Sequence, residues 1–436
     1  MTLRDALLAS RDAEVDGSLP TWLHERRAAA AGRVELVELD RLRDWSLDRE
    51  GRLVHASGRF FAIHGFEVER ERGRGRELVT QPLIGQSEIG LLGVLLRVVE
   101  GRAELLIQAK REPGDPRGAQ LAPTVQATIS NSSRVHGGRA TRGLAYFQSP
   151  RPEALVFDAD QPEQADLFFA KRNRNMIVRV DDAPEFADEP DFRWVTLAEL
   201  AALLGQPEAV NMSLRSVLAC VAALCLDVDP GAADSARAWL ATLGAGWSGW
   251  SCWSWRAREH PLDRLPGWNW TAQGLIAQDE RPHAGLRVVH VEVEAPRREI
   301  ASWSQPMLTR RELGRVALDL RRRAGGPEVL LRATLGPGQP EGVRLGASLH
   351  RIAASEHDAA PLGAELRFES TLAEDGGRLL AIRHRYQVFE HDHEPPAEGR
   401  WVRLAALPIL LAEGRLDIEL RTCLAALVLA CPDLIR

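Results

Sequence analysis

The block Gln108-Ala109-Lys110-Arg111-Glu112-Pro113 follows an apolar run and holds three side chains that could act together on a ligand. If the apolar run is a β-strand, its side chains alternate, so Gln108 and Lys110 share one face and Glu112 stands at the strand's end. An amide, an ammonium and a carboxylate would then converge. The alternative is an exposed ion pair between Lys110 and Glu112, which would contribute under ~1 kcal/mol to stability.

A second block, Lys171-Arg172-Asn173-Arg174-Asn175, supplies cations and amide donors of the kind that bind a diphosphate. Alternation along a strand leaves the alternative that Arg172 and Arg174 face solvent instead. Other neutral side chains would suit a base and sugar hydroxyls. They are Gln81, Thr124, Gln126, Ser130 and Asn131.

The sequence contains an internal repeat. Motifs that occur in both copies could be required by the fold and not by catalysis. Gln81-Pro82-Leu83 has a counterpart in Gln305-Pro306-Met307, and Pro113-Gly114-x-Pro116-x-Gly118 in Pro337-Gly338-x-Pro340-x-Gly342. Arg193-Trp194-Val195 likewise matches Arg400-Trp401-Val402. Because Gln81-Pro82 and Pro113-Gly114 recur, the fold itself could require them in a turn or an edge strand.

The repeat also divides the chain into segments. We expect an N-terminal helical segment over residues 1–32 and a first repeat, the active lobe, over 33–225. A linker over 226–254 and a diverged second repeat over 255–436 follow. A chain of 436 residues is too long for one ordinary core, so two cores are expected.

Runs of β-branched and alternating residues predict strands in both repeats. They cover residues 60–68, 91–99, 103–109 and 175–180 in the first repeat and 287–293, 316–320 and 329–333 in the second. Residues 197–204 and 213–226 have apolar side chains three and four positions apart, which predicts amphipathic helices. The predicted fold class is therefore α+β, with two tandem mixed-sheet lobes related by a pseudo-twofold axis.

Composition argues against several classes of function. The formal net charge of −6 gives no field that would favour a polyanion, so no nucleic acid is expected as a partner. The five cysteines include no C-x-x-C pair, which argues against a disulfide framework and a structural zinc site. A reducing, cytoplasmic location fits this pattern. The apolar runs are too short to cross a bilayer, so no membrane is expected.

Motifs for metals and common cofactors are missing as well. The sequence contains no P-loop, no G-x-S-x-G elbow, no H-E-x-x-H and no E-x-x-E-E cluster of the kind that holds Mg²⁺ in Nudix hydrolases. His391, Asp392 and His393 fit a solvated loop better than a set of metal ligands. No metal is therefore expected.

Long motifs in a fixed order resemble the NDP-hexose 2,3-dehydratase family. They are SGRFFAIHG (Ser57 to Gly65), QPLIGQSEIGLLG (Gln81 to Gly93), LLIQAKREPGDPRGAQLAPTVQATISN (Leu105 to Asn131), RVHGG (Arg134 to Gly138), FFAKRNRNMIV (Phe168 to Val178) and NMSLRSVLAC (Asn211 to Cys220). The resemblance is dense in the first half of the chain and thin in the second. It implies a duplicated Nudix-like fold without the Nudix metal signature.

The resemblance also implies a cofactor-independent lyase of deoxysugar biosynthesis, which removes water across C2–C3 of an NDP-4-keto-6-deoxyhexose. The C4 ketone acidifies the C3 proton, a base removes it, an electrophile stabilises the enolate, and the C2 hydroxyl leaves as water. We expect Glu112 to be the base and Lys110 the enolate stabiliser, with Glu88 and Glu163 as reserve carboxylates. The implied product is a 3,4-diketo-2,6-dideoxy sugar nucleotide that a downstream reductase consumes. The family resemblance further implies a homodimer.

The second repeat departs from the family pattern. Where relatives tend to repeat AK-x-EPG and PTVQ, this chain has RATLG (Arg332 to Gly336) and ASLH (Ala347 to His350). The counterparts of Gln108, Lys110, Glu112 and Gln126 are therefore all replaced. Gln161-Pro162-Glu163 also lacks the serine of the family's Gln-Ser-Glu. We expect the second site to be structural or vestigial. The alternative function is that of a non-catalytic or divergent sugar-nucleotide-binding protein of the same fold.

Overall fold

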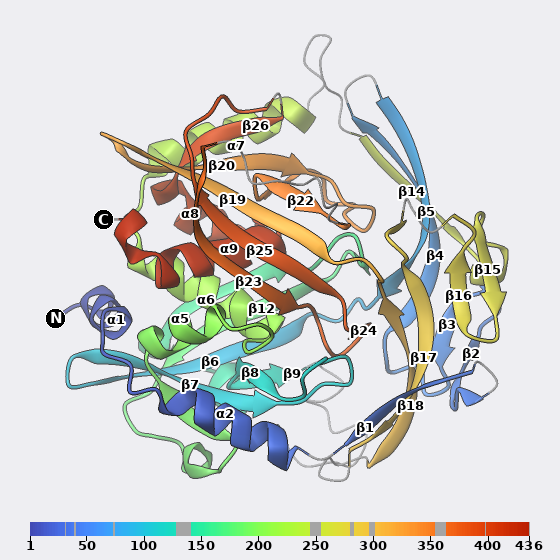
Figure 1. Cartoon of the computed structure of the whole chain (residues 1–436), viewed down its shortest axis with the longest axis horizontal. Helices are drawn as coiled ribbons and strands as arrows, with labels where there is room; N and C mark the ends of the chain where they lie inside the picture. The colour runs from blue at the N-terminus through green and yellow to red at the C-terminus, as the bar shows by residue number, and fades with distance from the viewer. Residues whose placement is uncertain are drawn as a thin grey trace.

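The computed structural model describes residues 1–30, 32–38, 41–72, 75–127, 141–244, 254–279, 283–295, 301–353, 363–396 and 398–435. Figure 1 shows two sheets with most of the helices on the left of the view and two further sheets on the right. Both chain termini lie on the left. The described residues therefore form two pairs of sheets that lie beside each other.

The first repeat forms two sheets within the described residues. The β4 sheet has the order β11-β5-β4-β3-β2 and contains β2 (Trp45–Leu47), β3 (Leu53–His55), β4 (Ala62–Arg72), β5 (Gly75–Gly85) and β11 (Phe168–Phe169). The β6 sheet has the order β10-β12-β6-β7-β13 and contains β6 (Gly90–Val99), β7 (Arg102–Lys110), β10 (Leu155–Pro162), β12 (Arg172–Arg179) and β13 (Phe192–Val195), with β8 (Gln120–Pro123) on β7 and β9 (Val125–Ala127) on β6. Both sheets are mixed, because β11 runs parallel to β5 and β12 parallel to β6.

The second repeat has the same topology. The β17 sheet has the order β15-β16-β17-β18-β24 and contains β15 (Trp268–Thr271), β16 (Gly274–Ala277), β17 (Arg287–Glu294), β18 (Ser302–Thr309) and β24 (Leu379–Leu380). The β19 sheet contains β19 (Gly314–Arg323), β20 (Gly326–Thr334), β21 (Arg344–Gly346), β22 (Leu349–Arg351), β23 (Glu365–Ala373), β25 (Arg383–Glu390) and β26 (Gly399–Arg403). The parallel pairs recur as β18–β24 and β19–β25. The predicted α+β class and the internal duplication are thus confirmed.

Each repeat gives one strand to the other. Strand β1 (Arg33–Val37) pairs antiparallel with β17 of the second repeat, and β14 (Ser254–His260) pairs antiparallel with β4 of the first. The segment at the start of each repeat therefore completes a sheet of the opposite repeat. Strand exchange of this kind ties the two repeats together through backbone hydrogen bonds.

Polar residues mark the helix starts. Thr2 and Asp5 form a capping box at α1 (Leu3–Arg11), and Thr196 and Glu199 form another at α5 (Leu197–Leu204). Asn211 caps α6 (Met212–Cys225), and its counterpart Asp417 caps α9 (Ile418–Ala430). The remaining helices of at least six residues in the described part of the chain are α2 (Ser18–Ala29), α7 (Pro230–Gly244) and α8 (Leu407–Ala412).

The cores do not follow the repeats. Helices α6 and α9 pack against each other between the β6 and β19 sheets, and one hydrophobic cluster includes Leu96 and Val217 of the first repeat with Leu318 and Leu424 of the second. The β4 and β17 sheets share another cluster in the same way. Two large cores exist, as expected from chain length, but both repeats build each of them.

The repeated Pro-Gly loops also link the repeats. Gly114 N donates to Gly376 O at 2.7 Å, and Gly338 N donates to Ala165 O at 2.6 Å. A Cβ on either glycine would overlap a backbone carbonyl of the facing repeat. The glycines recur in the sequence because these close approaches of two backbones recur in the fold.

The predicted strands and helices are confirmed within a few residues at their ends. The predicted strands correspond to β4, β6, β7, β12, β17, β19 and β20, and the predicted helices to α5 and α6. The helical segment over 1–32 contains α1 and α2. The segment 226–254, expected as a linker, contains the fifteen-residue helix α7, which contacts α8 and β26 of the second repeat.

Candidate active site

Two polar side chains contact the carboxylate of Glu112 where β7 ends. Its Oε1 accepts a hydrogen bond from Gln126 Nε2 at 3.0 Å, and Lys110 Nζ lies 3.4 Å from the same oxygen. Gln126 accepts in turn from Asn211 Nδ2 at 3.3 Å. Glu112 is only 8% exposed. The ammonium and the carboxylate therefore lie together at the strand's end, at a covered position and not on an open surface.

Asp115 fixes the loop that carries Glu112. Its carboxylate accepts hydrogen bonds from Glu112 N at 2.8 Å and from Gln120 Nε2 at 2.9 Å. Burial, and then the charge of Glu112, raise the pKa of Asp115 well above its usual range. Burial and the neighbouring Glu112 carboxyl group therefore both oppose a negative charge on Asp115.

A second polar group lies where β10 ends and β12 begins. Lys171 Nζ donates to the backbone carbonyl of Glu88, and Asn173 Nδ2 donates to Glu163 Oε1 at 2.6 Å. Glu163 N bonds Lys171 O at 2.9 Å, which keeps these two residues side by side. Their side chains are almost fully buried, at 3% exposed for Glu163 and 4% for Lys171.

Burial shifts both of these groups towards neutrality. It raises the pKa of Glu163, against the opposing field of Arg421. Burial and then the charge of Arg378 lower the pKa of Lys171 to about 8. A carboxyl group that holds its proton more tightly and an ammonium that releases it more easily are suited to proton transfer near neutral pH.

The turn 374–378 of the second repeat joins the two groups. Asp375 acts electrostatically on Asp115 of the first group and on Glu163 and Lys171 of the second. A Cβ on Gly377 would lie 3.6 Å from Glu112 Oε1, so this turn passes directly over Glu112. We call the whole assembly the polar centre. It comprises Lys110, Glu112, Asp115, Gln126, Glu163, Lys171, Asn173, Asp375 and Arg378.

Several buried atoms in the polar centre, and one of the adjoining Glu88, have no hydrogen-bond partner. Among the described residues these include Glu163 Oε2, Glu88 Oε2 and Arg378 Nε. Arg378 pairs with Asp375 at 2.8 Å through another nitrogen. Buried donors and acceptors are nearly always satisfied in folded proteins, so unsatisfied ones of both kinds at one place point to a polar ligand.

Arg421 of α9 supports the polar centre from behind. Its guanidinium donates to Pro162 O at 2.7 Å, Gln161 Oε1 at 3.3 Å and Leu416 O at 3.1 Å, and it is fully buried. Arg215 of α6 makes the matching bonds to the end of β23. Helix α9 of the second repeat therefore holds the end of β10, next to Glu163. Helix α6 of the first repeat holds the end of β23, next to Glu374.

Three of the predicted binding residues make contacts within the fold. Thr124 Oγ1 donates to the carbonyl of Leu106 and accepts from Leu95 N at 3.0 Å, so it joins β6 and β7. Gln108 Nε2 donates to Pro123 O at 2.9 Å, on the strand face that it shares with Lys110. Gln81 Nε2 donates to Asp166 O at 2.6 Å, and its counterpart Gln305 bonds Gly377 O in the same way. The recurrence of Gln81 is thus explained by a loop contact.

The side chains of residues 172–175 alternate between the two faces of β12. Asn173 faces the polar centre, whereas Arg172 pairs with Glu341 at 2.6 Å and Arg174 with Asp158 at 2.5 Å on the opposite face of β12. Asn175 is fully buried and donates to Ser216 Oγ at 2.7 Å. Arg172, Arg174 and Asn175 therefore lie apart from the polar centre. Ser130 and Asn131 fall outside the described residues.

The sequence did not predict the place of four residues in the polar centre. Lys171 was expected only as a cation for a diphosphate, and Asp115, Asp375 and Arg378 were not expected at the site. One signal in the composition marks Lys171: of 55 lysine and arginine residues, only Lys110 and Lys171 are lysines. Both lie in the polar centre.

The counterpart region of the second repeat has a different set of side chains. Glu374 Oε1 accepts from His384 Nδ1 at 2.7 Å and from Tyr386 OH at 2.9 Å, and Glu374 Oε2 from Gln164 Nε2 at 2.5 Å. Burial opposes ionisation, but these donors hold the pKa of Glu374 below its usual range. Thr334, Gly336 and His350 stand where the first repeat has Lys110, Glu112 and Gln126, so no lysine–glutamate pair exists there.

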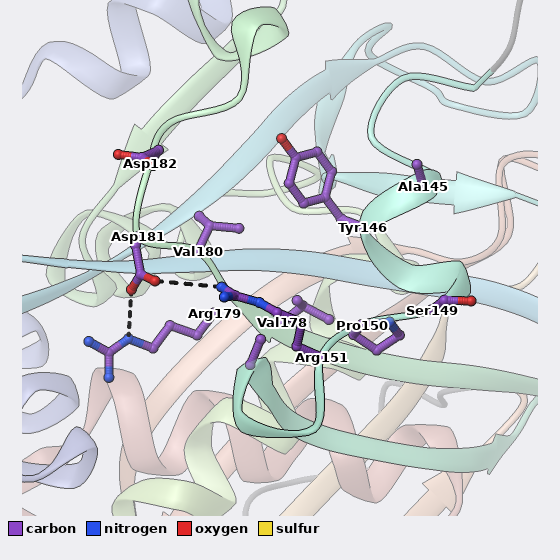
Figure 2. A pocket seen from close by; sticks show the side chains of 11 residues that line it. Ala145, Tyr146, Ser149, Pro150, Arg151, Val178, Arg179, Val180, Asp181 and Asp182 are labelled. Carbon is purple, nitrogen blue, oxygen red and sulfur yellow. Dashed lines mark ion pairs between the residues drawn. The ribbon is translucent and has the colours of Figure 1, made fainter.

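A cavity of about 430 Å³ lies at the far end of β12 (Figure 2). Its lining includes Tyr146, Arg151, Arg179 and Asp181, and Figure 2 shows Asp181 between the two arginines. Asp181 lies 3.6 Å from Arg151 and 3.9 Å from Arg179. The cavity contains none of the predicted site residues.

The described residues contain no group of three or more His, Cys, Asp or Glu side chains arranged to hold a metal ion. They also contain no helix with the length and apolar character needed to span a membrane.

Comparison with known proteins agrees with the duplicated architecture. The model of the family described as NDP-hexose 2,3-dehydratase matches residues 16–221 and 250–427. A dTDP-4-dehydro-6-deoxy-α-D-glucopyranose 2,3-dehydratase from Amycolatopsis orientalis is 37% identical over 430 residues, which cover 93% of this chain and 88% of that protein.

Two further relatives carry the same name. The protein from Saccharopolyspora spinosa is 33% identical over 453 residues, covering 94% of this chain and 92% of its own length. The protein from Streptomyces violaceoruber is 35% identical over 439 residues, covering 94% of this chain and 96% of its own length. The family match and these identities extend over both repeats, and the chain therefore belongs to the NDP-hexose 2,3-dehydratase family, as a carbon–oxygen lyase of nucleotide-linked hexoses.

Proposed function

We propose that the polar centre of the first repeat is where this chain removes water from an NDP-4-keto-6-deoxyhexose. The observation that carries the proposal is the pairing of Lys110 and Glu112 at 3.4 Å beneath Gly376 and Gly377. The first repeat, residues 33–225, is then the active lobe. The second repeat, 255–436, completes it with Asp375 and Arg378.

The reaction needs a base, an electrophile and an acid. The C4 ketone acidifies the C3 proton, and Glu112 removes it as a carboxylate whose position Gln126 fixes. Lys110 stabilises the enolate oxygen at C4 with its ammonium. The electron pair then forms the C2–C3 double bond as the C2 hydroxyl departs with a proton, as water. The resulting enol tautomerises to the 3,4-diketo-2,6-dideoxy sugar.

The substrate proposed is the one in the names of the relatives, a dTDP-linked 4-keto-6-deoxyglucose. Its hydroxyls would meet the unsatisfied acceptors Glu163 Oε2 and Glu88 Oε2. The product carries adjacent ketones and an acidic C2 methylene, so the reaction class that consumes it is a carbonyl reduction. A separate reductase is the proposed downstream partner.

Three further features are proposed, the first and third from the family resemblance and the second from the cysteine pattern. The two repeats are Nudix-like lobes, the protein is cytoplasmic, and it is a homodimer. The mixed β6 and β19 sheets, on which α6 and α9 pack, support the first, and the free buried cysteines Cys220, Cys225, Cys423 and Cys431 fit the second. Light scattering of the purified chain tests the third, with twice the mass of the 48.2 kDa chain expected.

The alternative is a sugar-nucleotide-binding protein without turnover, and one experiment separates the two functions. The chain is incubated with dTDP-4-keto-6-deoxyglucose in D₂O, and the products are followed by mass spectrometry and NMR. Loss of water with deuterium entering at C2 is the expected result. Saturable binding without loss of water would instead support the alternative.

A further inference from the structure

We propose that Lys171 is the general acid of the reaction and gives its proton to the departing C2 hydroxyl. This inference rests on the proposed function, because it assigns the third proton-handling role at the same polar centre. The roles of base and electrophile at Glu112 and Lys110 leave the departure of hydroxide without help, and an unprotonated hydroxide is a poor leaving group.

The position of Lys171 suits this role. Its Nζ donates to the backbone carbonyl of Glu88, which holds the ammonium in place without neutralising it. The carboxylates of Glu163 and Asp375 both act on it, and neither forms a direct ion pair with it among the described contacts. An ammonium held by a neutral carbonyl remains able to give a proton to a ligand oxygen.

The chemistry of the side chain also favours Lys171 over the nearby arginines. A guanidinium does not release its proton at any pH that a folded protein meets, whereas an ammonium can. The chain uses arginine at nearly all of its 55 basic positions and lysine only at 110 and 171. An ammonium that only neutralised charge at position 171 would be replaceable by arginine, so the use of lysine there agrees with proton transfer.

The pair Lys110 and Glu112 and the pair Lys171 and Glu163 both lie near the turn 374–378. A Cβ on Gly377 of this turn would be 3.6 Å from Glu112 Oε1. Asp375 of the same turn interacts electrostatically with Asp115, Glu163 and Lys171. A hexose bound at this turn therefore meets a base from one group and an acid from the other. The proton balance closes because Glu112 gains the C3 proton, Lys171 loses one to the leaving water, and solvent restores both groups.

The test uses a leaving group that needs no proton. The wild type, Lys171→Arg and Lys171→Met are compared on the natural 2-hydroxy substrate and on its 2-deoxy-2-fluoro analogue, from which fluoride departs unaided. Both variants are expected to lose about 100- to 10,000-fold in kcat on the hydroxyl substrate. On the fluoro analogue they are expected to stay within about fivefold of the wild type in fluoride release.

Exchange at C3 supplies a second readout. Both variants are expected to keep exchanging the C3 proton with D₂O, because base and electrophile remain. Arg179→Met is the matched control, since Arg179 stands at the other end of β12 and its side chain is 49% exposed. It is expected to behave as wild type on both substrates.

Two outcomes would overturn the assignment of Lys171 while leaving the proposed function intact. One is an equal loss on the hydroxyl and fluoro substrates, which would make Lys171 a positioning residue. The other is full activity of Lys171→Arg on the hydroxyl substrate, which would show that Lys171 supplies only a positive charge. A wild type that releases neither water nor fluoride would overturn the proposed function itself.

Discussion

Gln126 Nε2 lies 3.0 Å from Glu112 Oε1, although Gln126 stands on β9 and Glu112 in the loop after β7. The bond orients the carboxylate towards the turn 374–378, which the second repeat supplies. It also has no equivalent in the second repeat, where His350 and Gly336 occupy the two positions. This hydrogen bond therefore distinguishes the first repeat, where the active site is proposed, from the second.

Replacement of Gln126 by methionine removes this hydrogen bond at nearly constant side-chain length. A hydrogen bond to a charged group contributes about 1.5–3 kcal/mol, so kcat is expected to fall about 10- to 100-fold. Steady-state kinetics on the 2-hydroxy substrate measures the effect. His350→Gln, at the counterpart position, is the control and is expected to change kcat by less than about twofold. Equal losses in the two variants would contradict the asymmetry of the repeats.

Gly338→Ala tests whether the second repeat holds the Glu163–Lys171 loop in place. The added Cβ would overlap the carbonyl of Phe168, so the loop must shift. We expect the free energy of unfolding to fall by about 1–3 kcal/mol. In the fraction that remains folded, kcat should fall more than KM rises. Gly205→Ala, which meets no atom closer than 3.7 Å, is the control for urea unfolding and kinetics. Unchanged kcat in Gly338→Ala would contradict this coupling.

Arg421→Met should destabilise the fold strongly. It leaves the carbonyl of Pro162 and the amide oxygen of Gln161 without this donor, and Glu163 without the cation that most opposes the rise in its pKa. Breaking a buried charged network in this way costs about 3–5 kcal/mol. Urea unfolding measures the loss against Arg179→Met, for which we expect a change within about 0.5 kcal/mol. A similar small change in both variants would show that Arg421 contributes little.

His290 gives a prediction about acid stability. It is fully buried on β17, neither ring nitrogen has a hydrogen-bond partner among the described residues, and burial lowers its pKa to about 4. Between its ordinary value and about pH 4, the unfolded chain binds a proton at His290 that the folded chain does not. Stability from this group is therefore complete above pH 6.5 and is lost as the pH falls.

The variant His290→Phe lacks this proton uptake. It should be more stable than the wild type at pH 5 by about 1–3 kcal/mol, with a smaller difference at pH 7.5. Thermal unfolding at the two pH values measures this. A difference that does not depend on pH would show that His290 titrates normally in the folded chain.

Much of the secondary structure was predictable because it is encoded locally. The apolar runs around Leu95 and Leu106 are rich in Leu, Val and Ile, and Thr196 and Asn211 mark helix starts by capping. The exchange of β1 and β14 was not predictable, because a strand's pattern specifies which face is buried and not which sheet it joins. The shared cores follow from that exchange and from the packing of α6 on α9.

The site was predictable in part for the same reason. Alternation along β7 places Lys110 beside Glu112, and alternation along β12 separates Asn173 from Arg172. This alternation could not show which face of β12 meets the ligand. It also could not show that Asp375 of the second repeat lies at the site. Those contacts join residues far apart in the chain, and they depend on the close approach of Gly114 and Gly376.

If Glu112 removes the C3 proton, its loss must stop proton exchange at C3. The rate of C3 proton exchange with D₂O is measured by NMR for wild type, Glu112→Gln and the control Thr334→Ser. We predict that Glu112→Gln loses exchange and dehydration together by at least about 100-fold while still binding the nucleotide sugar, and that Thr334→Ser matches the wild type. Exchange and dehydration at the wild-type rate in Glu112→Gln would contradict the account.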